Sequence, residues 1–224
     1  MKIRELVDFL LKNRKHELFL TTYVIIYTLM FEFAEAVVPT SGYAVSYLKI
    51  DDYIPFCEEF IIFYGAWFVF LGATGLYAIV REPMAYRRFM YFMMIGYTSA
   101  VLFFLLFPNG QDLRPTVFPD SNIFTWLVGF AYSVDTNTNV FPSIHVIGAV
   151  QAMLVYFDAH SLKPYRWWAV GLTVLIIFST VFVKQHSILD MFGGLLWCVP
   201  CTIAVYGEKG VFKFRLRKNR RAFW

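Results

Sequence analysis

Charged residues are scarce in this sequence: Asp, Glu, Lys and Arg together make up 16% of its 224 residues. Soluble domains carry about 25%, so a water-soluble fold of this composition would expose large apolar patches and aggregate. Cysteine is also rare, with three residues, which excludes a disulfide-rich scaffold. Hydrophobic residues make up 58% and aromatic residues 20%, as is typical of lipid-facing helices with aromatic belts. The composition therefore predicts an integral membrane protein.

Six apolar stretches approach the length of a membrane-spanning helix, which is about 20 residues. The fourth is the shortest, because Asp158 and His160 follow it. No linker or repeat divides the chain, so we expect an all-α, polytopic membrane protein with one six-transmembrane-helix bundle at residues 18–206. This domain lies between a basic N-terminal segment, 1–17, and a basic tail, 207–224. The stretches are residues 18–38, 56–80, 89–107, 143–157, 167–183 and 187–206.

The distribution of lysine and arginine tests this division. Four regions hold 17 of the 20 basic residues: the N-terminal segment, residues 81–88, residues 163–166 and the C-terminal tail. With six spans these regions fall on one side, which the positive-inside rule makes the cytoplasm. We therefore expect both termini in the cytoplasm and a multi-pass protein of the cell membrane. Residues 34–36 resemble a signal-peptidase site; we favour an uncleaved first helix, and cleavage would leave five spans.

The expected outer side carries polar residues that apolar helices do not need. Its longest connection covers residues 108–142 and runs into Pro142-Ser143-Ile144-His145. Proline suits the first turn of a helix and serine can cap it. Free N–H groups and the helix dipole at such an end suit an anion. We therefore expect His145 within the first turn of a helix that can hold a phosphate.

A second histidine has a carboxylate nearby on the next outer connection. His186 and Asp190 are four residues apart, which predicts that they share one face of the sixth helix. A carboxylate so placed can fix the tautomer of a histidine, orient its ring and stabilise the imidazolium. The two residues could also simply satisfy each other at a bundle surface. Another histidine, a serine at a helix start and an arginine on the same side favour a catalytic site.

These residues resemble the motifs of the type 2 phosphatidic acid phosphatase (PAP2) superfamily, which includes membrane lipid phosphatases and sphingolipid synthases. The family pattern is Lys-x6-Arg-Pro, then Pro-Ser-Gly-His, then Ser-Arg-x5-His-x3-Asp. This chain has Arg114-Pro115, then Pro142-Ser143-Ile144-His145, then Ser179, His186 and Asp190 at the family's spacing. It departs from the pattern at Phe107, Ile144 and Thr180, where the family has Lys, Gly and Arg. With two cationic phosphate ligands missing, the site looks more like that of the sphingolipid-synthase branch.

The resemblance also implies roles for these residues. His186 attacks phosphorus and forms a phosphohistidine, Asp190 orients it, and His145 exchanges protons with the leaving and accepting oxygens. No metal or cofactor is expected, and no zinc-type cluster is present in the sequence. Lys184 is a hypothetical replacement for a missing cation. The expected phosphate ligands, besides the backbone at the start of the fourth helix, are Arg114, Ser143, Ser179 and Lys184.

The resemblance predicts an integral membrane lipid phosphatase that hydrolyses a lipid phosphoester at the outer leaflet, with its active site on the extracytoplasmic face. One alternative is a lipid phosphotransferase, which passes a headgroup to a lipid hydroxyl. An alternative of another class is a non-catalytic lipid-binding or scaffold protein. The expected partners are a phosphorylated membrane lipid and the bilayer. The basic run 209–221 suits contact with anionic lipid headgroups, and nucleic acid is not expected because no folded nucleic-acid-binding module accompanies the run. The lipid, the acceptor and the oligomeric state stay open.

Six acidic residues on the outer side have two interpretations. They could bind a cationic or polyhydroxyl headgroup, or they could pair with Arg114, Lys184 and Lys49, as charges near a span tend to do. Two of them are three residues apart on one face of the first helix and are best placed to line a cavity. We favour structural pairing for the set as a whole. The residues are Glu32 and Glu35 in the first helix, then Asp51, Asp52, Glu58 and Glu59.

Overall fold

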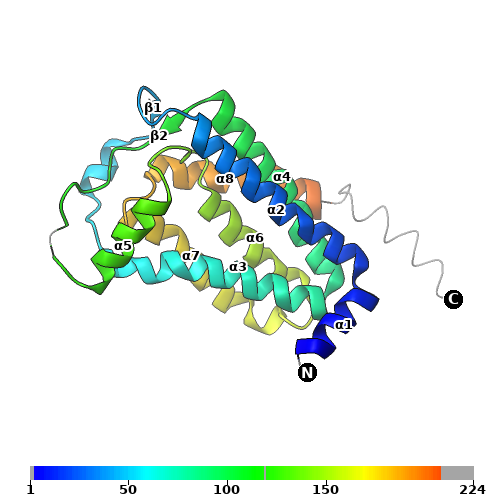
Figure 1. Cartoon of the computed structure of the whole chain (residues 1–224). Helices are drawn as coiled ribbons and strands as arrows, with labels where there is room; N and C mark the ends of the chain where they lie inside the picture. Colours follow the sequence, from blue (N-terminus) through cyan, green and yellow to red (C-terminus); the bar gives the residue numbers. More distant parts are fainter. Residues whose placement is uncertain (1–2, 119, 208–224) are drawn as a thin grey trace.

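A computed structural model describes residues 3–118 and 120–207, which fold into a bundle of α-helices (Figure 1). The predicted helical fold is therefore confirmed. Two short strands, β1 (Ala44–Val45) and β2 (Asn109–Gly110), pair in parallel. The basic run 209–221 lies outside the described residues. The helices are α1 (Ile3–Asn13), α2 (Lys15–Val37), α3 (Ile61–Arg81), α4 (Pro83–Leu106), α5 (Ile123–Val134), α6 (Ile144–Asp158), α7 (Arg166–Phe182) and α8 (Ile188–Tyr206).

Five of the described helices, α2, α3, α4, α7 and α8, are long and apolar enough to cross a membrane. Their outward sides carry exposed apolar side chains; Ile25, Val69 and Leu196 are each 65–70% exposed. Apolar surface of this extent is unfavourable in water, whereas a hydrocarbon layer accommodates it. The arrangement therefore suits a multi-pass position in a lipid bilayer.

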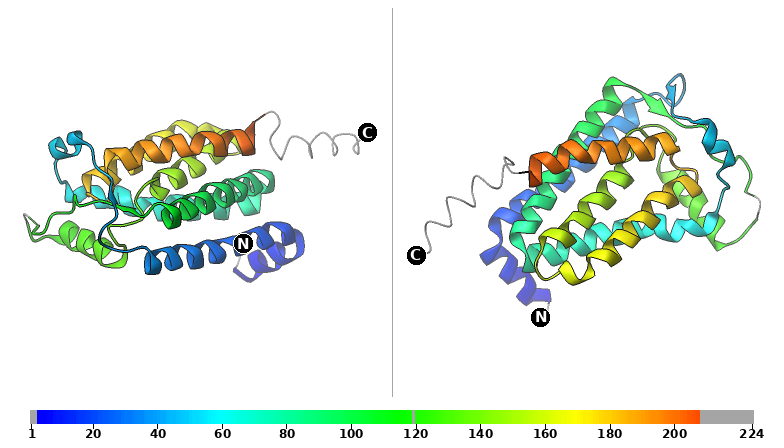
Figure 2. Two further views of the ribbon diagram at one scale, coloured as in Figure 1. Left: turned by 90° about the horizontal axis from the view of Figure 1, so that it is seen from above. Right: turned by 180° about the vertical axis from the view of Figure 1, so that it is seen from behind.

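The fourth predicted span forms α6, whose 15 residues fall short of the length that a membrane helix needs. It packs against α3, α4, α7 and α8, and Figure 2 shows it among these helices. Val146, Ile147 and Ala152 are fully buried. Gln151 donates from Nε2 to the carbonyl of Phe89 in α4 at 2.9 Å. Because protein surrounds α6, this helix contributes to the core of the bundle.

The long connection 108–142 contains a helix, α5, that the sequence analysis misses. Asn122 caps it by accepting from the backbone N–H groups of Phe124 and Thr125 at 2.8 and 3.0 Å. Its 12 residues are too few to predict a membrane span. The helix packs against the start of α3. Part of the predicted loop is therefore a structured wall at this end of the bundle.

The N-terminal basic segment also folds. Residues 3–13 form α1, and Arg14 lies between α1 and α2. Its Nε and Nη2 donate to the carbonyls of Ile79 and Val80 near the end of α3, at 2.9 and 3.2 Å. This contact satisfies carbonyls that a helix end leaves without a partner.

The two ends of the bundle differ. α1 and the last turn of α8 lie at one end, while α5, β1, β2 and the starts of α6 and α8 lie at the other (Figures 1 and 2). The predicted motif residues belong to this second end, because they precede or begin α6 and α8. The candidate site is therefore built where the helices start.

Candidate active site

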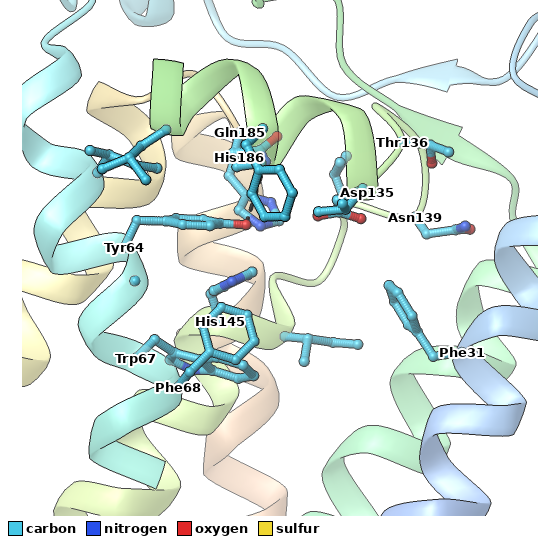
Figure 3. Close-up of a pocket in the computed structure, with 18 of the residues that line it drawn as sticks. Phe31, Tyr64, Trp67, Phe68, Asp135, Thr136, Asn139, His145, Gln185 and His186 are labelled. Carbon is cyan, nitrogen blue, oxygen red and sulfur yellow. Dashed lines mark hydrogen bonds between the residues drawn. The ribbon is translucent and has the colours of Figure 1, made fainter. Parts of the chain in front are cut away.

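A cavity of about 630 Å³ lies between α2, α3, α5 and the start of α6 (Figure 3). Aromatic and aliphatic side chains form most of its wall, and His145 and His186 both face it. The centroids of the two imidazole rings are 5.7 Å apart. The structure therefore brings together the two predicted catalytic histidines, which are 41 positions apart in sequence.

His145 lies at the start of α6 and packs against two aromatic rings at tilted angles. Ser143 is the N-cap of α6, and its Oγ accepts from the backbone N–H of Val146 at 3.4 Å. The helix start therefore lies where the sequence predicts it. The imidazole centroid lies 4.4 Å from that of Tyr64 and 4.6 Å from that of Trp67, both in α3. Nε2 of His145 is buried and has no hydrogen-bond partner among the described residues.

The sequence analysis expects His186 on the sixth predicted helix. The structure instead places it in the loop before that helix. α8 begins at Ile188, and Ser187 caps it by accepting from the N–H of Leu189 at 2.9 Å. Asp190 in the first turn accepts from the N–H of Ser187 at 2.8 Å. This reciprocal capping turns the carboxylate toward the preceding loop. His186 Nδ1 and Asp190 Oδ2 are consequently 3.5 Å apart.

The Asp190 carboxylate is fully buried and has a second side-chain partner that the sequence analysis misses. Ser46 donates from Oγ to Asp190 Oδ1. Ser46 follows β1, and its N–H donates to the carbonyl of Gly110 in β2 at 2.7 Å. Only the pairing of two short strands places this serine, so no local sequence signal reveals it. Because Asp190 faces Nδ1, Nε2 is the nitrogen of His186 left for the cavity.

The two predicted serine ligands do not line the cavity. Ser179 is fully buried within α7, where its Oγ donates to the carbonyl of Ile176 at 2.6 Å. Ser143 is also fully buried, and its Oγ is engaged in capping α6. Both hydroxyls therefore have structural partners in this conformation.

Arg114 stands behind the cavity wall. Its guanidinium donates to the carbonyls of Tyr132, Asp135 and Thr136 at 3.4, 3.1 and 2.6 Å. It also donates to Gln185 Oε1 at 2.5 Å. Burial lowers the pKa of Arg114, and the nearby Asp135 opposes that shift. Arg114 thus caps the end of α5 and fixes Gln185, the residue before His186.

Replacing Arg114 by lysine is expected to loosen the end of α5. Lysine keeps the charge but cannot form the same planar fork of bonds. Loss of one charged hydrogen bond costs about 1.5 kcal/mol or more, so amides in residues 132–136 should exchange hydrogen about tenfold faster. Hydrogen exchange followed by mass spectrometry measures this. Arg166→Lys, at the exposed start of α7, is the matched control; equal exchange in both variants would contradict the capping role.

Lys184 does not reach the cavity either. Its Nζ donates to the carbonyls of Asp51 and Ile54 at 3.0 and 2.7 Å. Burial lowers the pKa of this lysine, and the Asp51 carboxylate opposes that shift. In this conformation the ammonium holds the segment before α3, so the hypothesis that it replaces a missing phosphate ligand requires a rearrangement of the side chain.

The acidic residues accept hydrogen bonds from neutral groups. Asp51 accepts from Ser187 Oγ and from the N–H of Ile188 at 2.8 and 2.9 Å, which ties it to the start of α8. Glu35 of α2 accepts from Thr136 and Asn139, two residues of the cavity wall. Of the other four, Asp52 accepts from Tyr47 and Glu58 accepts from Asn122. Asp52, Glu32 and Glu59 are exposed.

Comparison with protein-family models, curated proteins and solved structures finds no match. The functional assignment therefore depends on the motif residues and the geometry of the cavity.

The charge of the cavity wall is the feature that sequence reasoning misses. No lysine or arginine is among the described residues that line it, whereas Asp135 is. Burial raises the pKa of Asp135 to about 6, and the nearby Glu35 carboxylate adds to the shift. Asp135 lies just after α5, inside the connection read as a loop. Because the sequence analysis does not predict α5, it does not distinguish Asp135 from an exposed loop carboxylate.

Proposed function

We propose that this protein is a membrane enzyme that cleaves a lipid phosphoester through a phosphohistidine. The observation that carries the proposal is the meeting of His145 and His186 in one cavity, with Asp190 behind His186. Apolar residues form most of the wall, and Ile62, Phe68 and Phe130 line the cavity while being 55–61% exposed on the bundle surface. A lipid can therefore place its chains against this surface and its phosphate near the histidines.

The chemistry needs two proton transfers and two displacements at phosphorus. His186 Nε2 attacks phosphorus, the bond to the leaving alcohol oxygen breaks, and His145 gives that oxygen a proton. His145 then takes a proton from the acceptor, whose oxygen attacks phosphorus and breaks the P–N bond. Asp190 holds His186 in the reactive tautomer and stabilises its positive charge. The start of α6 and the imidazolium groups supply positive potential for the phosphate oxygens.

The proposed topology has six spans in the cell membrane, with α6 as the fourth. Both termini are cytoplasmic, and the cavity faces the outer side. The distribution of basic residues supports this orientation. It is also supported by the position of α1 and the last turn of α8 at the end opposite the cavity (Figure 1).

The leading reaction is hydrolysis by a PAP2-type phosphatase, and the second candidate is headgroup transfer to a lipid hydroxyl. The apolar wall supports transfer as the second candidate, because an acceptor lipid could enter the same cavity as the donor. The absence of lysine and arginine from the described wall also fits the departures at Phe107 and Thr180. A non-catalytic lipid-binding protein is the third candidate.

A product assay separates these reactions. Purified protein in vesicles is given lipid phosphomonoesters or phosphodiesters, with and without diacylglycerol or ceramide. Release of inorganic phosphate or of a water-soluble headgroup supports hydrolysis, and a new headgroup lipid supports transfer. Ser133→Ala changes an exposed residue of α5. It is the control for effects of mutation and purification that do not involve the histidines. Lipid binding without turnover on any substrate would overturn the enzymatic proposal.

A further inference from the structure

Helix α1 carries an apolar stripe that no other described residue covers. The stripe consists of Ile3, Val7 and Leu11, which are 83%, 46% and 58% exposed. Their spacing of four residues places them on one side of the helix. Leu6 and Leu10, on the adjoining side, are partly buried, and Leu10 packs against the core of the bundle. One edge of α1 is therefore attached to the protein, and the stripe beside it has no protein partner in the described chain.

The direction of α1 is set at Arg14. The backbone there is not helical, with φ −128° and ψ 31°, so α1 turns away from the line of α2 (Figures 1 and 2). The Arg14 guanidinium donates to the carbonyls of Ile79 and Val80 near the end of α3. It also lies over the ring of Phe9 in α1, with Cζ 5.2 Å from the ring centroid. Arg14 thus holds α1 against the end of the bundle.

Aromatic side chains mark the membrane surface at this end. Trp167 and Trp168, at the start of α7, are 69% and 59% exposed. Exposed tryptophans of membrane proteins concentrate at the boundary between the hydrocarbon and the headgroups. Ser161, in the connection before α7, donates to Glu82 in the connection between α3 and α4, which follows the carbonyls that Arg14 contacts. These contacts place α1 near the headgroup level of one leaflet.

The polar side of α1 carries no excess of positive charge. Its exposed charged residues are two acidic and two basic: Glu5, Asp8, Arg4 and Lys12. Because these formal charges cancel, attraction to anionic headgroups contributes little. Burial of the apolar stripe is the main favourable contribution that a membrane surface offers this helix.

We infer that α1 is an interfacial helix, which lies in the plane of the bilayer surface at the end opposite the cavity and inserts its stripe among the lipid chains. Lipid is the occupant that fits the neighbouring surface, because α2 exposes apolar side chains from near its start; Phe19 is 72% exposed. This inference does not depend on the proposed function. Arg14 then couples the depth of α1 in the leaflet to the ends of α2 and α3.

Photocrosslinking identifies what contacts the stripe. In the full chain, in phosphatidylcholine vesicles, single residues are replaced by p-benzoylphenylalanine: Val7 and Leu11 in the stripe, Asp8 and Lys12 on the polar side, and Ile25 of α2 as the reference for lipid contact. The stripe positions should give about fivefold more lipid adduct than the polar positions and approach the yield at Ile25. Equal lipid yields on the two sides, a crosslinked dimer or an adduct with the C-terminal tail would overturn the inference.

Varying the lipid charge tests which force holds α1. Adding phosphatidylglycerol to the vesicles, or raising the salt concentration, should change the lipid adduct at Val7 and Leu11 by less than about twofold, because the charges on the helix cancel. Adducts that form only with the anionic lipid would show that charge holds the helix, and would overturn the role of the stripe.

A matched pair of double variants measures the effect of the stripe on α1. Val7→Gln with Leu11→Gln removes two apolar residues one turn apart, and Asp8→Gln with Lys12→Gln removes two charged residues at the same spacing. Both leave the net charge unchanged, and all four positions are exposed, so the bundle should fold in each. In vesicles, the amides of α1 should exchange hydrogen about tenfold faster than wild type in the first variant and within about twofold in the second. Equal exchange in the two variants would contradict insertion of the stripe.

Discussion

Replacing His186 by alanine is expected to lower turnover by at least about 1,000-fold, because the imidazole is the proposed nucleophile. Quenching in alkaline detergent during turnover of a lipid labelled at phosphorus should give a labelled wild-type protein. The label should be lost in acid and survive in alkali, as phosphohistidine does. The variant should carry no label.

The lipid affinity of His186→Ala is the control for correct folding. Binding should stay within a few-fold of wild type, because the apolar wall of the cavity is unchanged. Ser133→Ala should keep both turnover and label. If the His186→Ala protein still acquires a phosphorus label on histidine, another residue is the nucleophile. His145, which also lines the cavity, would then be the first to examine.

Replacing Asp190 by asparagine is expected to lower kcat by about 100- to 10,000-fold with little change in KM. The amide keeps the size of the side chain, but it cannot stabilise the positive charge on His186 and can select the wrong tautomer. Steady-state kinetics on the preferred lipid measure both constants. A variant with wild-type kcat would show that the 3.5 Å separation between His186 Nδ1 and Asp190 Oδ2 has no catalytic meaning.

Ser46→Ala is a milder change at the same carboxylate, and its effect on kcat can be compared with that of Asp190→Asn. It removes one donor to the carboxylate and leaves the N–H of Ser187 in place. Loss of one charge-assisted hydrogen bond corresponds to a decrease in kcat of about 10-fold. A loss as large as that of Asp190→Asn would mean that Ser46 does more than orient the carboxylate.

Features set by local sequence could be predicted. The apolar stretches locate the five long helices because a membrane span has a minimum length. Ser143 marks the start of α6 because a serine N-cap acts within one turn. The pairing of His186 with Asp190 also follows from spacing, although the loop position of His186 does not. Ser187, three residues before Asp190, is a capping signature that favours a helix starting after the histidine.

Features set by tertiary packing could not be predicted. Ser179 matches a motif position, but the direction of its hydroxyl depends on how α7 rotates against α6. Arg114 and Lys184 carry charges expected at a phosphate, yet buried backbone carbonyls compete for them. Asp135 gains its place in the cavity wall only because α5 folds over the start of α3.

Because other helices enclose α6, its residue His145 is shielded from the direct effects of changes in membrane thickness. A bilayer that is too thin or too thick tilts or strains the helices that touch lipid. α6 touches α3, α4, α7 and α8, so such strain reaches His145 only through the motion of its neighbours. The proposed proton-transfer group is thus shielded by protein, whereas the proposed entry surface for a substrate is formed by exposed apolar residues of the bundle. Changes in bilayer thickness should consequently alter KM before they alter kcat.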